Sequence, residues 1–133
     1  MPTTGKVAND IAQAMDTAQQ TAIDVLQEKE LSSTNFLVDG ALTKTTGLKA
    51  LTKATAGAYT LAAPTVDEEG AEITIVSDTA AAHVVTATGL IQDGVTGGSK
   101  TTMTFAAFAG ASIKLVAHAL KWTVVSKNVV TIS

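Results

Sequence analysis

The sequence predicts a mainly β protein: a small antiparallel β-sandwich or barrel with an N-terminal α-helix and an extended arm. Residues 111–126 alternate apolar and polar side chains on both sides of a tight turn, which is typical of two half-buried strands. Short β-branched segments recur at about ten-residue intervals after residue 57, as in sandwiches and small barrels. Residues 9–31 instead repeat apolar positions with helical spacing.

The hairpin within residues 111–126 is expected to hold the core together. Ile113, Leu115 and Ala117 share one face before the turn, and Trp122 and Val124 share one face after it. Trp122 is the only tryptophan, and a large aromatic side chain in a hairpin usually anchors a core. Further strands are expected at 59–61, 71–77, 83–87, 90–92, 101–107 and 129–132, so the predicted β domain covers residues 57–133.

Residues 1–31 are predicted to form a helical attachment or oligomerisation segment. Apolar side chains spaced four, three, four and three residues apart form a heptad seam, made of Ile11, Met15, Ala18, Ala22 and Val25. A helix this short with two alanines in its seam is marginal alone in water, so it needs a partner. Its own β domain, sister chains and another protein all remain open as that partner.

Residues 32–56 are rich in Thr, Ala, Lys and Gly, and they are predicted to form an extended arm or linker with one or two short strands. The composition also predicts oligomerisation. Aromatic residues make up only 4% of the chain and cysteine is lacking, so the core is built from small side chains without disulfide support. Small β domains of this kind often gain burial by associating.

Charge disfavours two classes of partner. The chain has a net charge of −3, and all nine basic residues are scattered lysines. Arginine provides the bidentate contacts used for phosphate and guanine, so we expect no nucleic-acid binding. The most apolar window, residues 103–120, contains Lys114 and His118 and is too short to span a bilayer, so we expect no membrane insertion.

No catalytic motif is present, and we expect neither an enzyme nor a bound cofactor or metal. His83 or His118 could hold an ion on a threefold axis, but an ordinary histidine is the simpler interpretation. The acidic turn at residues 67–69 could bind calcium together with Asp78 or Asp93, but it lacks alternating oxygen ligands. The glycine-rich residues 94–99 lack the Gly-Lys-Ser/Thr sequence of a phosphate-binding loop.

Two aromatic side chains, Tyr59 and Trp122, could stack on a sugar, as in an adhesin. For Trp122, core packing is the favoured interpretation because it alternates with polar neighbours. A carbohydrate-binding role therefore stays open only as an alternative.

Five segments together resemble the β domain found in tailed-phage head fibres, capsid decoration proteins and some tail fibres. They are Ala58 to Pro64, Gly70 to Ser77, Ala82 to Thr86, Gly110 to Ala117 and Lys121 to Ser126, and the resemblance covers roughly residues 57–133. The chain departs from that pattern before the Lys-Trp pair, where His118-Ala119-Leu120 replaces a glycine-containing turn.

The resemblance implies a homotrimer with a structural role on the capsid surface of a virion. The implied partner is the major capsid protein of a phage head, contacted through the N-terminal region. The alternative that it leaves open is a tail-fibre or receptor- or carbohydrate-binding module of a phage. It implies no catalytic residues.

Overall fold

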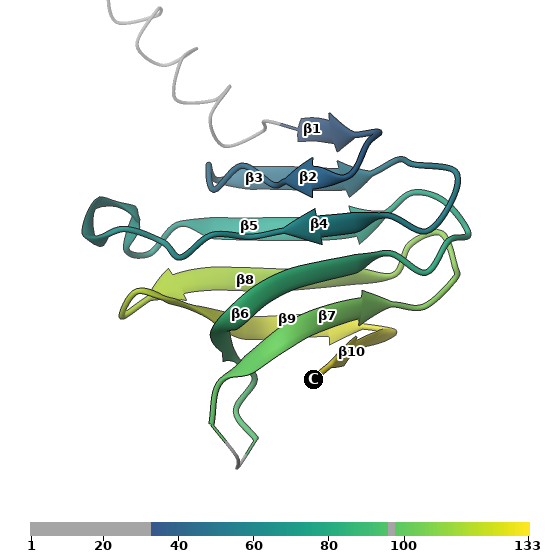
Figure 1. Cartoon of the computed structure of the whole chain (residues 1–133). Coiled ribbons are helices and arrows are strands. Elements are labelled where there is room, and N and C mark those ends of the chain that lie inside the picture. Colours follow the sequence, from purple (N-terminus) through teal and green to yellow (C-terminus); the bar gives the residue numbers. More distant parts are fainter. Residues whose placement is uncertain (1–32, 96–97) are drawn as a thin grey trace, which may run out of the picture. The chain divides into compact units, whose positions relative to one another are not determined.

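The computed structural model describes residues 33–95 and 98–133, all of which belong to a compact unit spanning Ser32–Ser133 (Figure 1). The predicted N-terminal helix and its seam of Ile11, Met15, Ala18, Ala22 and Val25 lie outside the described residues. The described part is mainly β, as the sequence predicts. None of its helices is long and apolar enough to cross a membrane.

Ten strands and one short 3-10 helix make up the described chain. In order they are β1 (Ser33–Phe36), β2 (Gly40–Ala41), β3 (Gly47–Leu51), β4 (Ala58–Thr60), η1 (Val66–Glu68), β5 (Glu72–Ser77), β6 (Val84–Gln92), β7 (Lys100–Phe105), β8 (Ser112–His118), β9 (Lys121–Asn128) and β10 (Val130–Ile132).

The strands form one sheet that curls into an open half-barrel with two facing limbs (Figure 1). The hydrogen-bonded order is β1-β3-β5-β8-β9-β6-β4-β2, and β7 pairs with β6 and β10 at the side. The prediction of an antiparallel sheet is wrong for the pairs β1–β3, β3–β5, β2–β4, β4–β6 and β6–β9, which are parallel. The pairs β5–β8, β8–β9, β6–β7 and β7–β10 are antiparallel.

Four of the five parallel pairs arise because the first six strands wind as a flattened coil. Strands β1, β3 and β5 lie in one limb, and strands β2, β4 and β6 lie in the other. The chain therefore crosses between limbs after every strand and returns one step further along, which makes successive strands in each limb parallel. The closing strands β7 to β10 pair with antiparallel neighbours, except that β9 lies parallel to β6.

Residues 33–51, predicted to form an arm or linker, supply three strands of this sheet. Leu42 and Leu51 are 4% and 0% exposed and belong to the hydrophobic core. Strand β3 pairs over five residues with β5, and the parallel neighbours Leu51 and Ser77 are both buried. These short strands are thus stabilised by pairing with the next turn of the coil rather than by their own composition.

The core lies between the two limbs and follows the predicted alternation. Ile113, Leu115, Ala117 and Trp122 are at most 1% exposed, and Met103 and Phe105 of β7 are fully buried. Val124 is partly buried against the core, whereas its neighbour Val125 is exposed. The prediction that Trp122 packs in the core is confirmed.

The hairpin between β8 and β9 turns through two residues that lack glycine. Ala119 and Leu120 have φ angles of +50° and +61°, and His118 pairs with Lys121 across the turn. Positive φ at both central residues is the requirement of a type I′ turn, in which Asn-Gly is the preferred pair. The departure from a glycine-containing turn therefore leaves a two-residue hairpin, at the expense of backbone strain.

Candidate functional site

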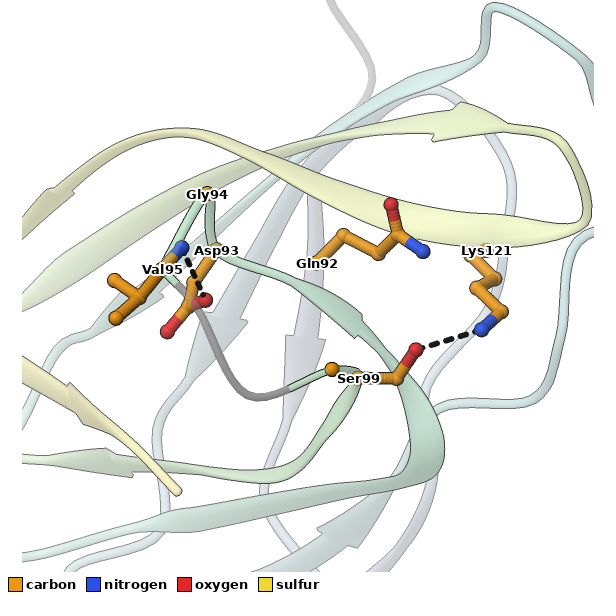
Figure 2. A pocket seen from close by; sticks show the side chains of 7 residues that line it. Gln92, Asp93, Gly94, Val95, Ser99 and Lys121 are labelled. Atoms are coloured by element: carbon orange, nitrogen blue, oxygen red, sulfur yellow. Dashed lines mark hydrogen bonds between the residues drawn. The ribbon is translucent and has the colours of Figure 1, made fainter.

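A polar hollow lies where β6 turns into β7, beside the start of β9. It has a volume of about 410 Å³ and is lined by Gln92, Asp93, Gly94, Val95, Gly98, Ser99 and Lys121. In Figure 2 the Lys121 and Ser99 side chains point toward one another, with 2.6 Å between Lys121 Nζ and Ser99 Oγ. Asp93 faces its own loop, where its carboxylate accepts a hydrogen bond from the Val95 N–H at 3.0 Å.

The hollow presents polar groups of several kinds. Lys121 supplies one cation, and Gln92 and Ser99 add an amide and a hydroxyl. The carboxylate of Asp93 is engaged in an Asx-type turn, which is an ordinary way to stabilise a loop. The lining contains no histidine that could act as a base toward Ser99.

Both aromatic residues considered for sugar stacking are buried. Trp122 is 0% exposed and donates its indole N–H to the carbonyl of Ala62, with 2.9 Å between Nε1 and O. Tyr59 is 1% exposed and donates its hydroxyl to the carbonyl of Phe36 at 3.1 Å. Neither ring is presented to solvent in this structure, and burial raises the pKa of Tyr59.

The two histidines have opposite environments. His118 is exposed at the β8–β9 turn, where its Nδ1 lies 2.6 Å from Glu69 Oε1. The second oxygen of Glu69 accepts a hydrogen bond from the backbone N–H of Ala119 at 3.0 Å. One carboxylate therefore contacts both the His118 side chain and the backbone of the strained turn. His83 is fully buried, and both of its ring nitrogens are hydrogen-bonded.

The acidic turn forms the short helix η1 and the residue after it. Glu68 accepts the backbone N–H of Thr65 at 2.8 Å and lies 2.9 Å from Lys44 Nζ. The Thr65 backbone hydrogen bond, followed by the bond from Lys44, lowers the pKa of Glu68. Within the described ranges, no group of three or more histidine, cysteine, aspartate or glutamate side chains is arranged to hold a metal.

A connected set of polar groups ties together three loops at one end of the coil, and we call it the loop network. Its members are Asp39, Lys53, Gly57, Thr79 and His83. The loops are those that follow β1, β3 and β5, which leave their limb at the same end because these strands are parallel. The loop network was not predicted; the only sequence signals were the turn residues near positions 39 and 57.

Two contacts of the loop network fix the protonation of His83. The Gly57 N–H donates to Nδ1 at 3.0 Å, so Nδ1 is the acceptor. The Thr79 hydroxyl donates to the carbonyl of Lys53 at 2.7 Å and lies 2.9 Å from Nε2, so Nε2 carries the hydrogen and donates to Thr79. His83 is thus held as a neutral imidazole, and burial, followed by the charge of Lys53, lowers its pKa.

A buried lysine is a second feature that sequence patterns did not indicate. Lys49 is 0% exposed, and its register partner on β5 is the core residue Ile75. Its ammonium group donates to the hydroxyl of Thr45 at 2.9 Å. Removal from water lowers the pKa of Lys49, because burial penalises the charged form.

Large apolar side chains are exposed mostly in loops and turns. They are Leu37, Val38, Val66, Val95, Phe108, Leu120, Val125 and Val129. Leu37 and Val38 sit in the loop after β1, next to Asp39 of the loop network. Val129 has a φ of +50°, which is unusual for a β-branched residue, and its carbonyl accepts the Ala106 N–H at 3.0 Å.

No protein-family model and no curated protein sequence matches this chain.

Proposed function

We propose that this chain is a structural protein of a tailed-phage virion. In this proposal it is a trimeric capsid decoration protein that docks on the major capsid protein through its N-terminal region and projects the β domain. The observation that carries the proposal is that three buried ring side chains of the described residues form hydrogen bonds to the backbone of distant segments. His83, Tyr59 and Trp122 fasten buried parts of the fold to one another, as expected for a module whose task is mechanical.

The docking surface in this proposal is the predicted seam of Ile11, Met15, Ala18, Ala22 and Val25. Its test is co-sedimentation with empty capsids of the phage that encodes the chain, comparing the full chain with a variant lacking residues 1–31. The proposal predicts saturable binding for the full chain and loss of binding for the shortened one. Full decoration by the shortened chain would overturn the docking assignment.

Trimerisation is tested separately by light scattering over a range of concentrations. A mass of three chains is expected, because the resemblance implies a homotrimer and a core with few aromatic side chains gains burial from association. A matched seam variant, Ile11→Asp with Met15→Asp, distinguishes the two roles of the N-terminal segment. Loss of the trimer together with capsid binding places the seam between chains, whereas loss of capsid binding alone places it on the capsid.

The polar hollow at the β6–β7 turn favours one second candidate, a receptor- or carbohydrate-binding module of a phage fibre. Gln92, Ser99 and Lys121 offer hydrogen-bonding groups of the kind that recognise sugar hydroxyls. A glycan array is the test, with Lys121→Ala as the site variant and Lys114→Ala on the neighbouring strand as its control. Binding that is lost only in Lys121→Ala would favour this candidate, and an array without signal would count against it.

A further inference from the structure

The loop network contains the one histidine that is fully buried within the described residues, and its geometry has a consequence for acid conditions. His83 Nδ1 accepts the Gly57 N–H, so a proton added at Nδ1 would point at another donor 3.0 Å away. The neighbouring Val84 N–H donates to the carbonyl of Gly57 at 2.9 Å, which holds the Gly57 peptide against this strand. A protonated imidazole therefore cannot keep the Gly57 contact without a movement of the loop.

The Nε2 side of the His83 ring connects, through Thr79, to the same loop as Gly57. Nε2–H donates to Thr79, and Thr79 donates in turn to the carbonyl of Lys53. The loop of residues 52–57 is thus attached to the loop of residues 78–83 at both of its ends, with His83 in the middle. Because the Thr79 contact survives protonation, the acid-sensitive connection is the one to Gly57.

We propose that His83 is an acid-sensitive latch whose protonation releases the Gly57 end of the loop between β3 and β4 from the loop between β5 and β6. The inference is independent of the proposed virion role. It implies that acid loosens the first turn of the coil, because that turn is attached to the released loop. Asp39 accepts hydrogen bonds from Lys53 Nζ at 2.9 Å and from the Ala58 N–H at 3.1 Å, and the hydroxyl of Tyr59 reaches Phe36 at the end of β1.

The charged and titratable groups around His83 favour this response. Lys53 from the β3–β4 loop opposes a second positive charge, and Asp39 from the β1–β2 loop partly offsets it. The hydrogen bond from Lys53, followed by that from Ala58, lowers the pKa of Asp39, so this carboxylate stays ionised while histidine titrates. Tyr59 presents an edge-to-face ring to His83, at 5.8 Å between centroids, and Asp78 lies exposed on the same loop as Thr79.

The direction in which stability changes with pH follows from the proton affinities of His83 in the folded and unfolded protein. An unfolded histidine binds its proton near pH 6.5, whereas folded His83 resists protonation until lower pH. Stability linked to His83 is therefore complete above pH 6.5 and decreases as the pH falls below it. The released loop should lose protection before the rest of the sheet does.

The experiment measures amide hydrogen exchange in the full chain between pH 7 and pH 5, corrected for the intrinsic exchange rate. The protection of Gly57 is expected to fall about tenfold, as for one linked proton, while that of Leu115 in the core changes little. His118→Gln removes the other histidine and should leave this response intact. His83→Asn keeps an acceptor near Nδ1 that does not titrate, and it should abolish the response.

Two results would overturn the latch. One is an unchanged Gly57 response in a folded His83→Asn chain. The other comes from the unmodified protein, so it holds even if that variant does not fold: nitrogen NMR of His83 showing a proton on Nδ1 at pH 7, or no titration of His83 above the pH of global unfolding. A neutral Nε2–H tautomer at pH 7 with a titration that coincides with Gly57 deprotection would support it.

Discussion

The indole N–H of Trp122 donates to the carbonyl of Ala62, a residue 60 positions earlier, across a distance of 2.9 Å. Trp122 lies at the start of β9, whereas Ala62 follows β4, and in the sheet order β6 lies between these two strands. This bond joins the closing hairpin to the coil that precedes it. A single side chain therefore packs in the core and connects the closing hairpin to the coil.

Replacing Trp122 by phenylalanine should lower the free energy of unfolding by about 1–3 kcal/mol, because the change removes a hydrogen bond and leaves unfilled volume. Urea denaturation measures this loss. Val125→Ala on the same strand is the control; its side chain is 55% exposed, so a change within about 0.5 kcal/mol is expected. Equal effects of the two substitutions would contradict the anchoring role of Trp122.

Replacing Gly57 by alanine should destabilise the fold by about 1–3 kcal/mol, because overpacking forces the neighbours to move. A Cβ at this position would lie 2.6 Å from Cε2 of the Tyr59 ring. The measurement is a double-mutant cycle with Tyr59→Leu, which removes the ring. The cost of Gly57→Ala should shrink in that background, and strictly additive costs would show that the ring is not the obstacle.

Replacing Leu120 by glycine should stabilise the protein by about 0.5–1 kcal/mol, since glycine adopts positive φ without the steric penalty paid by other residues. Thermal unfolding measures the gain. Ala80→Gly is the control with the opposite sign: Ala80 is exposed and is not among the non-glycine residues with positive φ. Its replacement should destabilise by about 0.4–1 kcal/mol, because glycine only adds freedom to the unfolded chain. A loss of stability in Leu120→Gly would contradict the strained-turn interpretation.

Replacing Lys49 by methionine should raise the free energy of unfolding at pH 7 by about 1–3 kcal/mol, because methionine has no ammonium group that must be withdrawn from water. The lowered pKa of Lys49 sets the sign of the pH dependence. The penalty on the buried ammonium is present at neutral pH and is relieved as the pH rises toward 10.5, so the advantage of methionine should shrink there.

Lys114→Met serves as the control for this lysine, because Lys114 is 41% exposed and forms a surface ion pair with Glu72. Its effect should stay within about 1 kcal/mol. A Lys49→Met chain that is less stable than the unmodified protein at pH 7 would show that the ammonium group makes a favourable contact beyond its bond to Thr45.

The closing part of the fold could be predicted from the sequence because its signals are local. The alternation around Ile113 and Trp122 and the buried face of Met103 and Phe105 identified β7, β8 and β9. The two segments predicted at residues 83–87 and 90–92 are one strand, β6, because Gly89 at φ +67° lets it continue through an irregularity in its pairing with β7.

The coil could not be predicted, since its strands are stabilised by neighbours far away in the sequence. The composition of β3, which contains Gly47 and Lys49, is typical of a linker, yet the strand pairs along its whole length with β5. Turn signals mark where the chain bends but not whether it returns to the same limb, so the parallel arrangement was missed. The buried contacts of His83 and Lys49 depend on that arrangement and were missed with it.

Cryo-electron microscopy of the virions to which the central proposal assigns this chain is its most direct test. We predict densities with threefold symmetry on the outer surface of the head, each accommodating three copies of the curled sheet of residues 33–133 and contacting the capsid through the N-terminal region. Particles whose heads carry no such density, or in which the chain is found only in the tail, would contradict the assignment as a capsid decoration protein.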